Sequence, residues 1–205
     1  DVEIAGTEPY IVGGHTASGY WVDTNRQTTI YGLYAAGDVA GGCPQKYVTG
    51  ALAEGKLAAL AMVRAHRKGD MEPGGIGSQA HEIISSYEQI LNAKQSGYSV
   101  EELEEAMQKV MDEYAGGIAT NYRYNEKQLA LAKQKIEQLI LLTQKLKADS
   151  MHDLLFVYEL KERLVVCRSV IAHLEGRKET RWHTFNENLD YPSEDPAYYG
   201  YVNSR

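Results

Sequence analysis

Apolar positions in the second half of the chain recur at the spacing of amphipathic helices. One set lies within residues 125–147 and the other within residues 150–174: Leu129, Ala132, Ile136, Leu139, Ile140 and Leu146, then Leu154, Val157, Tyr158, Leu164, Val165 and Ile171. Both sets follow a period close to 3.6 residues. Because only about three residues separate the two segments, we expect two long antiparallel helices that pack against each other.

Helix-capping patterns mark the starts of three of the predicted helices. The paired residues are Ser99 with Glu102, Asn125 with Gln128, and Ser150 with Asp153. In the first pair a serine is followed three residues later by a glutamate, which is the spacing of a capping box. We therefore predict helices at about 79–94, 99–114, 125–147 and 150–174, which together form a helical domain over residues 79–176.

Residues 1–68 follow a different pattern, rich in glycine and β-branched side chains. Short runs at Gly19–Val22, Gln27–Ile30 and Leu33–Ala36 indicate strands. Residues 50–66 indicate a helix, with these apolar contacts: Leu52, Leu57, Leu60, Ala61 and Val63. Residues 69–78 have the glycine and proline content of a linker. The predicted fold class is an α+β fragment: the end of an α/β domain, a helical bundle domain, and an extended surface tail over 177–205.

Charge and composition limit the classes of partner. The formal net charge of −7 argues against nucleic acid, because binding to phosphates needs a basic face. No run of about 18 apolar residues exists, so we expect no membrane insertion. The two cysteines, Cys43 and Cys167, lack metal-site spacing, which predicts no bound metal and favours a reduced, cytoplasmic setting. The chain begins without Met and with strand-like character, and we interpret it as part of a larger protein.

The segment from Gly37 to Leu52 carries the clearest candidate chemistry. A strand that ends in Gly37-Asp38 would place a carboxylate at the sheet edge where open α/β sheets bind ligands. The glycine would let a ligand approach closely, and the carboxylate could accept hydrogen bonds from sugar or ribityl hydroxyls. A helix that starts near Thr49 would offer unpaired amides and a positive dipole end. An ordinary strand–turn–helix with a solvated aspartate is the alternative interpretation.

These residues resemble a known family. GLYAAGDVAGG followed by TGALAEGKLAA resembles the late FAD-binding segment of the succinate dehydrogenase/fumarate reductase flavoprotein family. The tail RKETRWHTFNENLDYPSEDPAYYGYVNSR is similar to that family's Arg-x-Glu-Ser-Arg stretch and the acidic, aromatic, proline-containing segment after it. The Trp-His pair and the final YVNSR are most similar to the adenylylsulfate (APS) reductase alpha subunits within this family. The resemblance extends over nearly the whole chain.

The resemblance implies an FAD-dependent oxidoreductase. The resemblance also implies that adenylylsulfate is reduced to sulfite and AMP with electrons from an iron–sulfur subunit. The expected assembly is a homo-oligomer of heterodimers. Asp38, with Gly37 before it, would contact the ribityl chain of FAD. The small-residue helix start would line the pyrimidine edge of the flavin through Thr49, Gly50, Ala51 and Leu52. Residues 1–68 would then be the C-terminal segment of an FAD-binding domain.

Three residues are candidates for contact with an anionic substrate: His15, Lys46 and Arg181. By resemblance His15 lies close to the family's substrate-site histidine, although Gly14 aligns with that position. Lys46 stands where the succinate and fumarate enzymes have a carboxylate-binding arginine. A lysine is a point charge and not a bidentate fork, which favours a sulfate or phosphate group over a dicarboxylate. Arg181 and its neighbours could instead form a structural ion-pair network that fastens the tail.

Other functions remain open at this level. A fumarate reductase, succinate dehydrogenase or L-aspartate oxidase-like flavoenzyme would share the cofactor segment, and LYAAGD also resembles thioredoxin-reductase-like enzymes. A function of another class is a helical interaction module that docks an electron-transfer subunit. The sequence holds no GxGxxG phosphate loop, so we expect this chain by itself to bind FAD weakly and to be inactive.

Overall fold

The chain divides into two compact units, and each is described by itself. The computed structural model describes residues 19–42, 47–65, 76–94, 97–181 and 186–200. The first unit is Asp1–Glu72 and the helical unit is Pro73–Arg205. The division falls inside the stretch 69–78 that composition marks as a linker. His15, Cys43 and Lys46 lie outside the described residues.

The first unit consists of an irregular segment, residues 19–42, and the helix α2 (Val48–Ala65). The irregular segment contains one short 3₁₀ turn, η1 (Gly37–Val39), which packs against α2. Two isolated bridges order it: Tyr20 pairs with Ala40 in parallel, and Gln27 pairs with Tyr34 antiparallel. The three predicted strands are therefore wrong as strands within this segment. A ladder needs several consecutive paired residues, and these runs make only single bridges before the next turn.

The face of α2 that is buried also differs from the prediction. The buried residues of α2 are Glu54, Ala58 and Ala61. Of the predicted apolar contacts only Ala61 is buried, whereas Leu52 is 70% exposed and Val63 is 76% exposed. The irregular segment approaches α2 along its small residues, so the larger side chains have no cover among the described residues of this unit.

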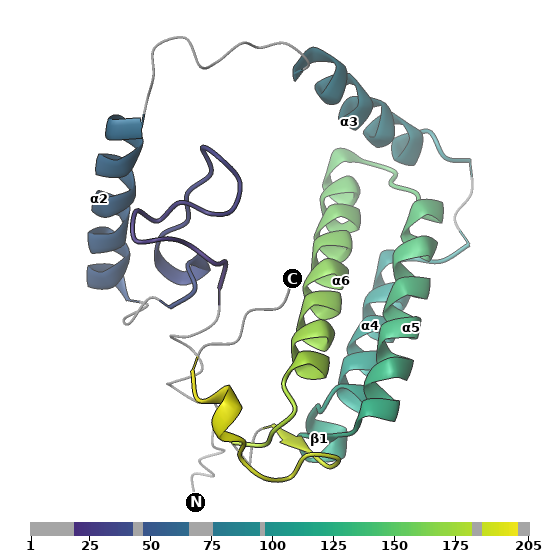
Figure 1. Cartoon of the computed structure of the whole chain (residues 1–205). Coiled ribbons are helices and arrows are strands. Elements are labelled where there is room, and N and C mark those ends of the chain that lie inside the picture. The colour runs from purple at the N-terminus through teal and green to yellow at the C-terminus, as the bar shows by residue number, and fades with distance from the viewer. Residues whose placement is uncertain (1–18, 43–46, 66–75, 95–96, 182–185, 201–205) are drawn as a thin grey trace, which may run out of the picture. The chain divides into compact units, whose positions relative to one another are not determined.

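The described residues of the helical unit form four α-helices: α3 (Ile76–Leu91), α4 (Val100–Tyr114), α5 (Glu126–Leu142) and α6 (Met151–Gly176). Helices α5 and α6 lie side by side with α4 against both (Figure 1). The largest fully buried apolar side chains come from these helices and the connection after α5: Leu129, Ile136, Leu146, Leu160, Leu164, Ile171 and Val157. The predicted stripes of both long helices are thus largely in the core. Val165 is the exception, because it is 45% exposed.

The three predicted caps are confirmed. Ser99 and Glu102 form a reciprocal capping box at the start of α4. The side chain of Asn125 accepts a hydrogen bond from the Gln128 amide at the start of α5, and Ser150 accepts one from the Asp153 amide at α6. Each cap satisfies an amide that has no partner in its helix's own ladder.

The connection between α5 and α6 begins earlier than the predicted helix end at 147. Helix α5 stops at Leu142 and is followed by a 3₁₀ turn, η3 (Thr143–Lys145). The hydroxyl of Thr143 donates to the carbonyl of Ile140 at 2.7 Å, which offers the backbone an alternative to the helical ladder. Leu146 then adopts an extended conformation and its side chain is buried, so it anchors the turn to the core.

The C-terminal tail is fastened to the helical unit by a small parallel sheet. Strand β1 (Arg123–Tyr124) pairs with β2 (Glu187–Asn188), and the 3₁₀ turns η2 (Ile118–Thr120) and η4 (Pro196–Tyr198) lie before β1 and after β2 in the chain. The hydroxyl of Thr180 donates to the Tyr191 carbonyl at 2.8 Å and accepts from the Asn188 amide at 2.9 Å. Thr180 and Asn188 are fully buried, so the extended tail is partly built into the fold and is not only a surface feature.

Candidate functional site

The turn at Gly37 and Asp38 lies directly against the beginning of α2. Gly37 is buried and has a φ of 73°, in the left-handed region that favours glycine. A Cβ added to Gly37 would lie 3.1 Å from the Cβ of Ala51, so the two backbones pack closely at this point. Asp38, the next residue, is exposed. The structure therefore brings a surface carboxylate next to the start of a helix.

The first turn of α2 adds amide donors beside this carboxylate. The amide of Ala51 donates to the carbonyl of Tyr47 at 2.8 Å, whereas the amides of the residues before it precede the helix's internal ladder. Thr49 and Leu52 are exposed, and Gly50 and Ala51 are half-buried. A group bound here would meet an acidic acceptor, small side chains and the positive end of the helix dipole.

An ion pair that the sequence interpretation missed contacts the turn, with its glutamate buried and its arginine half-buried. Glu54 is 4% exposed. Its Oε2 accepts a hydrogen bond from the Gly37 amide at 3.3 Å, and its Oε1 lies 3.2 Å from Nη2 of Arg26. The available signal was a single acidic residue among the alanines and leucines of α2, a pattern that indicates a paired charge when that face is buried.

Arg181 belongs to the helical unit, where its guanidinium is engaged by acidic residues of the tail. Its Nε and Nη2 donate to Glu179 at 3.1 and 2.7 Å, and its Nη1 donates to Glu194 at 3.0 Å. Glu179 also accepts from Arg177 and from the amide of Asp195. We call these five residues the Glu179 cluster. Its geometry is that of an ion-pair network, and His183 lies outside the described residues.

The Glu179 carboxyl is held in its charged form. Burial by itself raises the pKa of Glu179, but the hydrogen bonds from Arg181 and the Asp195 amide, with the charges of Arg177 and Arg181, outweigh it. The pKa of Glu179 therefore lies below its ordinary value. The aromatic ring of Tyr199 lies 5.7 Å from the Arg181 guanidinium, which adds a cation–π contact from the tail.

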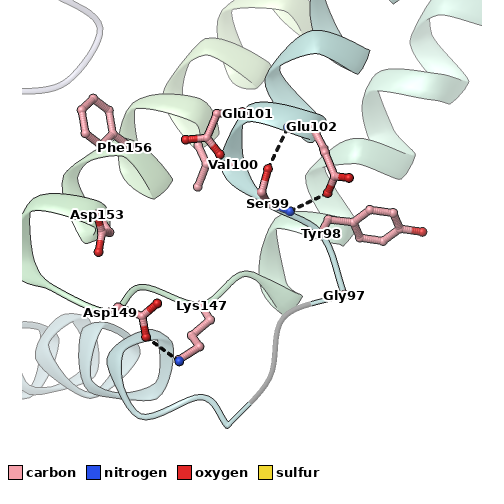
Figure 2. Close-up of a pocket in the computed structure, with 10 residues that line it drawn as sticks. All are labelled: Gly97, Tyr98, Ser99, Val100, Glu101, Glu102, Lys147, Asp149, Asp153 and Phe156. Carbon is pink, nitrogen blue, oxygen red and sulfur yellow. Dashed lines mark hydrogen bonds and ion pairs between the residues drawn. The ribbon is translucent and has the colours of Figure 1, made fainter.

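A surface hollow lies between the starts of α4 and α6 (Figure 2). Several of its polar groups have local partners. Ser99 and Glu102 cap α4, and Lys147 pairs with Asp149. Figure 2 shows both contacts and, separate from them, the Phe156 side chain of α6. We therefore assign no ligand to this hollow.

Neither a metal site nor a membrane span occurs in the described part of the chain. No group of three or more His, Cys, Asp or Glu side chains that could hold a metal ion is found there. Within the same residues, no helix combines the length and the apolar character needed to cross a membrane.

Comparison with solved structures defines the class of protein. The chain has a TM-score of 0.73 and 31% identity to adenylylsulfate reductase of Archaeoglobus fulgidus, over 85% of this chain and 29% of that one. It also has a TM-score of 0.72 to E. coli quinol fumarate reductase, with 21% identity over 88% of this chain and 32% of that one. The chain thus has the fold of one segment of these enzymes' chains.

Sequence comparison finds relatives that match most of this chain. The chain is 28% identical to the adenylylsulfate reductase alpha subunit of Megalodesulfovibrio gigas, over 99% of this chain and 36% of the relative. It is also 28% identical to an uncharacterised FAD-dependent oxidoreductase of Methanocaldococcus jannaschii, over 92% of this chain and 35% of that protein. No protein-family model matches the chain. Sequence and fold together show that the chain is homologous to part of the adenylylsulfate reductase alpha subunit, and it spans about a third of the length of the curated relatives it matches.

The described residues of the first unit fit one end of FAD. An exposed carboxylate and the first amides of a helix are groups that could hydrogen-bond to a ribityl chain and to a flavin pyrimidine edge. Asp38 supplies an acceptor for hydroxyls, and the start of α2 supplies donors for carbonyl oxygens. The donor set of the first unit therefore suits the flavin end of the cofactor.

Proposed function

We propose that the chain is the segment of an FAD-dependent oxidoreductase that holds the flavin end of the cofactor. One observation carries this proposal: the Gly37–Asp38 turn lies against the first turn of α2, in a chain homologous to part of an adenylylsulfate reductase alpha subunit. When bound, FAD would accept and donate two electrons at this site.

Each residue of this site has a stated task in the proposal. Asp38 would accept hydrogen bonds from ribityl hydroxyls and so help to hold the cofactor. The amides near Thr49 and Gly50 would donate to the pyrimidine edge, at the positive end of the helix dipole. Ala51 keeps the helix start close to Gly37, because the contact leaves no room for a larger side chain there.

The substrate of the whole protein is adenylylsulfate in this proposal, and its electrons come from an iron–sulfur subunit. The relative from Megalodesulfovibrio gigas carries the name of that activity, and Lys46 suits a sulfate or phosphate group. His15 is the candidate for a second contact with the substrate. Arg181, in contrast, serves to fasten the tail, because Glu179 and Glu194 engage its guanidinium.

Substitution of Asp38 tests the cofactor assignment. We expect the full-length protein to purify with FAD, and Asp38→Ala to weaken FAD binding about tenfold through loss of a hydrogen bond to a charged acceptor. Fluorescence titration of the apoprotein measures the dissociation constant. Asp149→Ala, an exposed aspartate of the helical unit, is the matched control and should leave the affinity unchanged. A flavin-free wild-type protein would contradict the assignment.

The substrate assignment is tested separately with the reduced flavoprotein. We expect adenylylsulfate to reoxidise the flavin, as recorded by the return of the visible absorbance that belongs to the oxidised cofactor itself. Fumarate in place of adenylylsulfate is the control. Reoxidation by fumarate alone would assign the protein to the dicarboxylate enzymes, and reduction by NADPH with a disulfide as acceptor would assign it to thioredoxin-reductase-like enzymes.

A further inference from the structure

We propose that Glu54 and Arg26 are positioning residues that fix the Gly37–Asp38 turn against α2 and thereby set the geometry of the ribityl contact. The inference rests on the proposed function, because its purpose is to place Asp38 for the cofactor. Neither residue would touch the flavin. Glu54 lies beneath the turn and is nearly inaccessible, so it acts through the backbone of Gly37.

The contacts of Glu54 join three segments of the first unit. Its Oε2 accepts from the Gly37 amide at 3.3 Å, and its Oε1 lies 3.2 Å from Nη2 of Arg26. The backbone carbonyl of Arg26 in turn accepts a hydrogen bond from the Ala35 amide at 3.0 Å. These contacts form a closed ring from α2 to Arg26, to the residues before the turn, and back to α2 through Gly37.

The backbone of Arg26 is shaped for this ring. Arg26 has a φ of 68°, which is uncommon for a residue with a side chain. The carboxylate of Asp23 holds the conformation by accepting from the amides of Asn25 and Gln27 at 2.8 and 2.9 Å. The strained turn directs the Arg26 side chain toward α2, where the Glu54 carboxylate meets it.

The ion pair between Glu54 and Arg26 is better explained by the position it gives the Gly37–Asp38 turn than by a contribution to the free energy of unfolding. Removing two charges from water offsets much of their attraction, and apolar residues of similar size often stabilise a fold as well. Hydrogen bonds, however, have direction. The Glu54 carboxylate fixes where the Gly37 amide points, and Asp38 follows Gly37 in the chain. A shift of the turn would therefore move the Asp38 carboxylate away from the ribityl hydroxyls.

The test measures FAD binding by the full-length protein and three variants. We expect Glu54→Ala to raise the dissociation constant about tenfold and to change the visible circular dichroism of the bound flavin, because the turn loses its anchor. Glu54→Gln keeps an oxygen for the Gly37 amide and should stay within about threefold of wild type. Arg26→Ala should weaken binding in the same direction as Glu54→Ala. The double alanine variant should raise the dissociation constant for FAD by less than the product of the two single-variant fold-changes.

The matched control is Glu82→Ala, an exposed glutamate of α3, which should bind FAD as wild type does. If wild type binds FAD and the two alanine variants bind it equally well, the positioning role is overturned while the proposed function stands. If the wild-type protein binds no FAD, both the positioning role and the proposed function are wrong. Should Glu54→Ala fail to fold, Glu54→Gln and Arg26→Ala decide the question. Wild-type affinity and dichroism in Arg26→Ala would then overturn the inference.

Discussion

Two carboxylates, Glu54 and Glu179, are buried among the residues that the structure describes, one in each unit. Both are paired with arginines and both accept a backbone amide: Gly37 for Glu54 and Asp195 for Glu179. Their tasks differ because they hold different segments of the chain. Glu54 supports a turn with an exposed aspartate, whereas Glu179 ties the tail to the end of α6 through Arg177.

Glu179 should make the stability of the helical unit depend on pH. Its pKa is lowered from 4.5 in the folded chain, so its stabilising contribution is present above the unfolded pKa and is lost as pH falls through the folded value. We expect Glu179→Gln to lower the urea midpoint clearly at pH 7. The difference from wild type should shrink as the pH falls below the ordinary glutamate pKa toward the lowered pKa of the folded chain.

Urea unfolding at a series of pH values measures this effect. Glu101→Gln, an exposed glutamate at the start of α4, provides the control and should show little difference from wild type at either end of the series. An equal loss of stability for Glu179→Gln at acid and neutral pH would mean that packing, and not charge, is what Glu179 contributes.

At the scale of elements, the helix starts are where local sequence and structure agree most closely. The Ser99 hydroxyl accepts from the Glu102 amide at 3.1 Å, and the Glu102 carboxylate accepts from the Ser99 amide at 2.8 Å. We expect Ser99→Ala to reduce the free energy of unfolding by about 1 kcal/mol, the usual effect of losing an N-cap. Chemical denaturation followed by far-UV circular dichroism measures the change.

Ser169→Ala is the matched control for the cap. Ser169 is exposed in the interior of α6, where its hydroxyl donates to the Val165 carbonyl at 2.9 Å. Such a bond competes with the helical ladder, so its removal should change stability by less than about 0.5 kcal/mol. Equal effects of the two substitutions would show that the capping box does not stabilise α4 beyond helix propensity.

Helix α2 shows that hydrophobic periodicity does not predict which face of a helix is buried. Its apolar residues suggested a face of leucines and valines, but Leu52 and Val63 are exposed while Ala58 and Ala61 are buried. Periodicity indicates which residues share a face, and it does not indicate which face the neighbouring segment covers. At the start of α2 the covering segment comes so close that a Cβ added to Gly37 would lie 3.1 Å from the Cβ of Ala51.

For the whole molecule, the two units differ in the kind of core they contain. The buried apolar residues described in the first unit are all alanines: Ala35, Ala40, Ala58 and Ala61. In the helical unit, large side chains such as Ile136, Leu160 and Leu164 are fully buried. Burial of apolar area is the main source of stability, so the helical unit should be the more stable of the two in this chain.

Hydrogen exchange of the 205-residue chain should report this difference. We expect amides of α5 and α6 to exchange much more slowly than amides of α2, because core helices open only with the whole unit. Peptide-resolved mass spectrometry measures both at once. Protection of α2 equal to that of α5 would show that the first unit has cover for its apolar side chains that its described residues do not supply.

The sequence by itself determined the local features: the apolar stripes of α5 and α6, the three N-caps, and the helix with a small-residue start after Gly37-Asp38. These depend on residues a few positions apart, so a linear pattern contains them. Tertiary structure alone decided that Glu54 reaches back to Gly37 and Arg26, that the tail pairs with β1, and that the predicted strands are single bridges. Those outcomes depend on which distant segments meet, and spacing along the chain does not specify that contact.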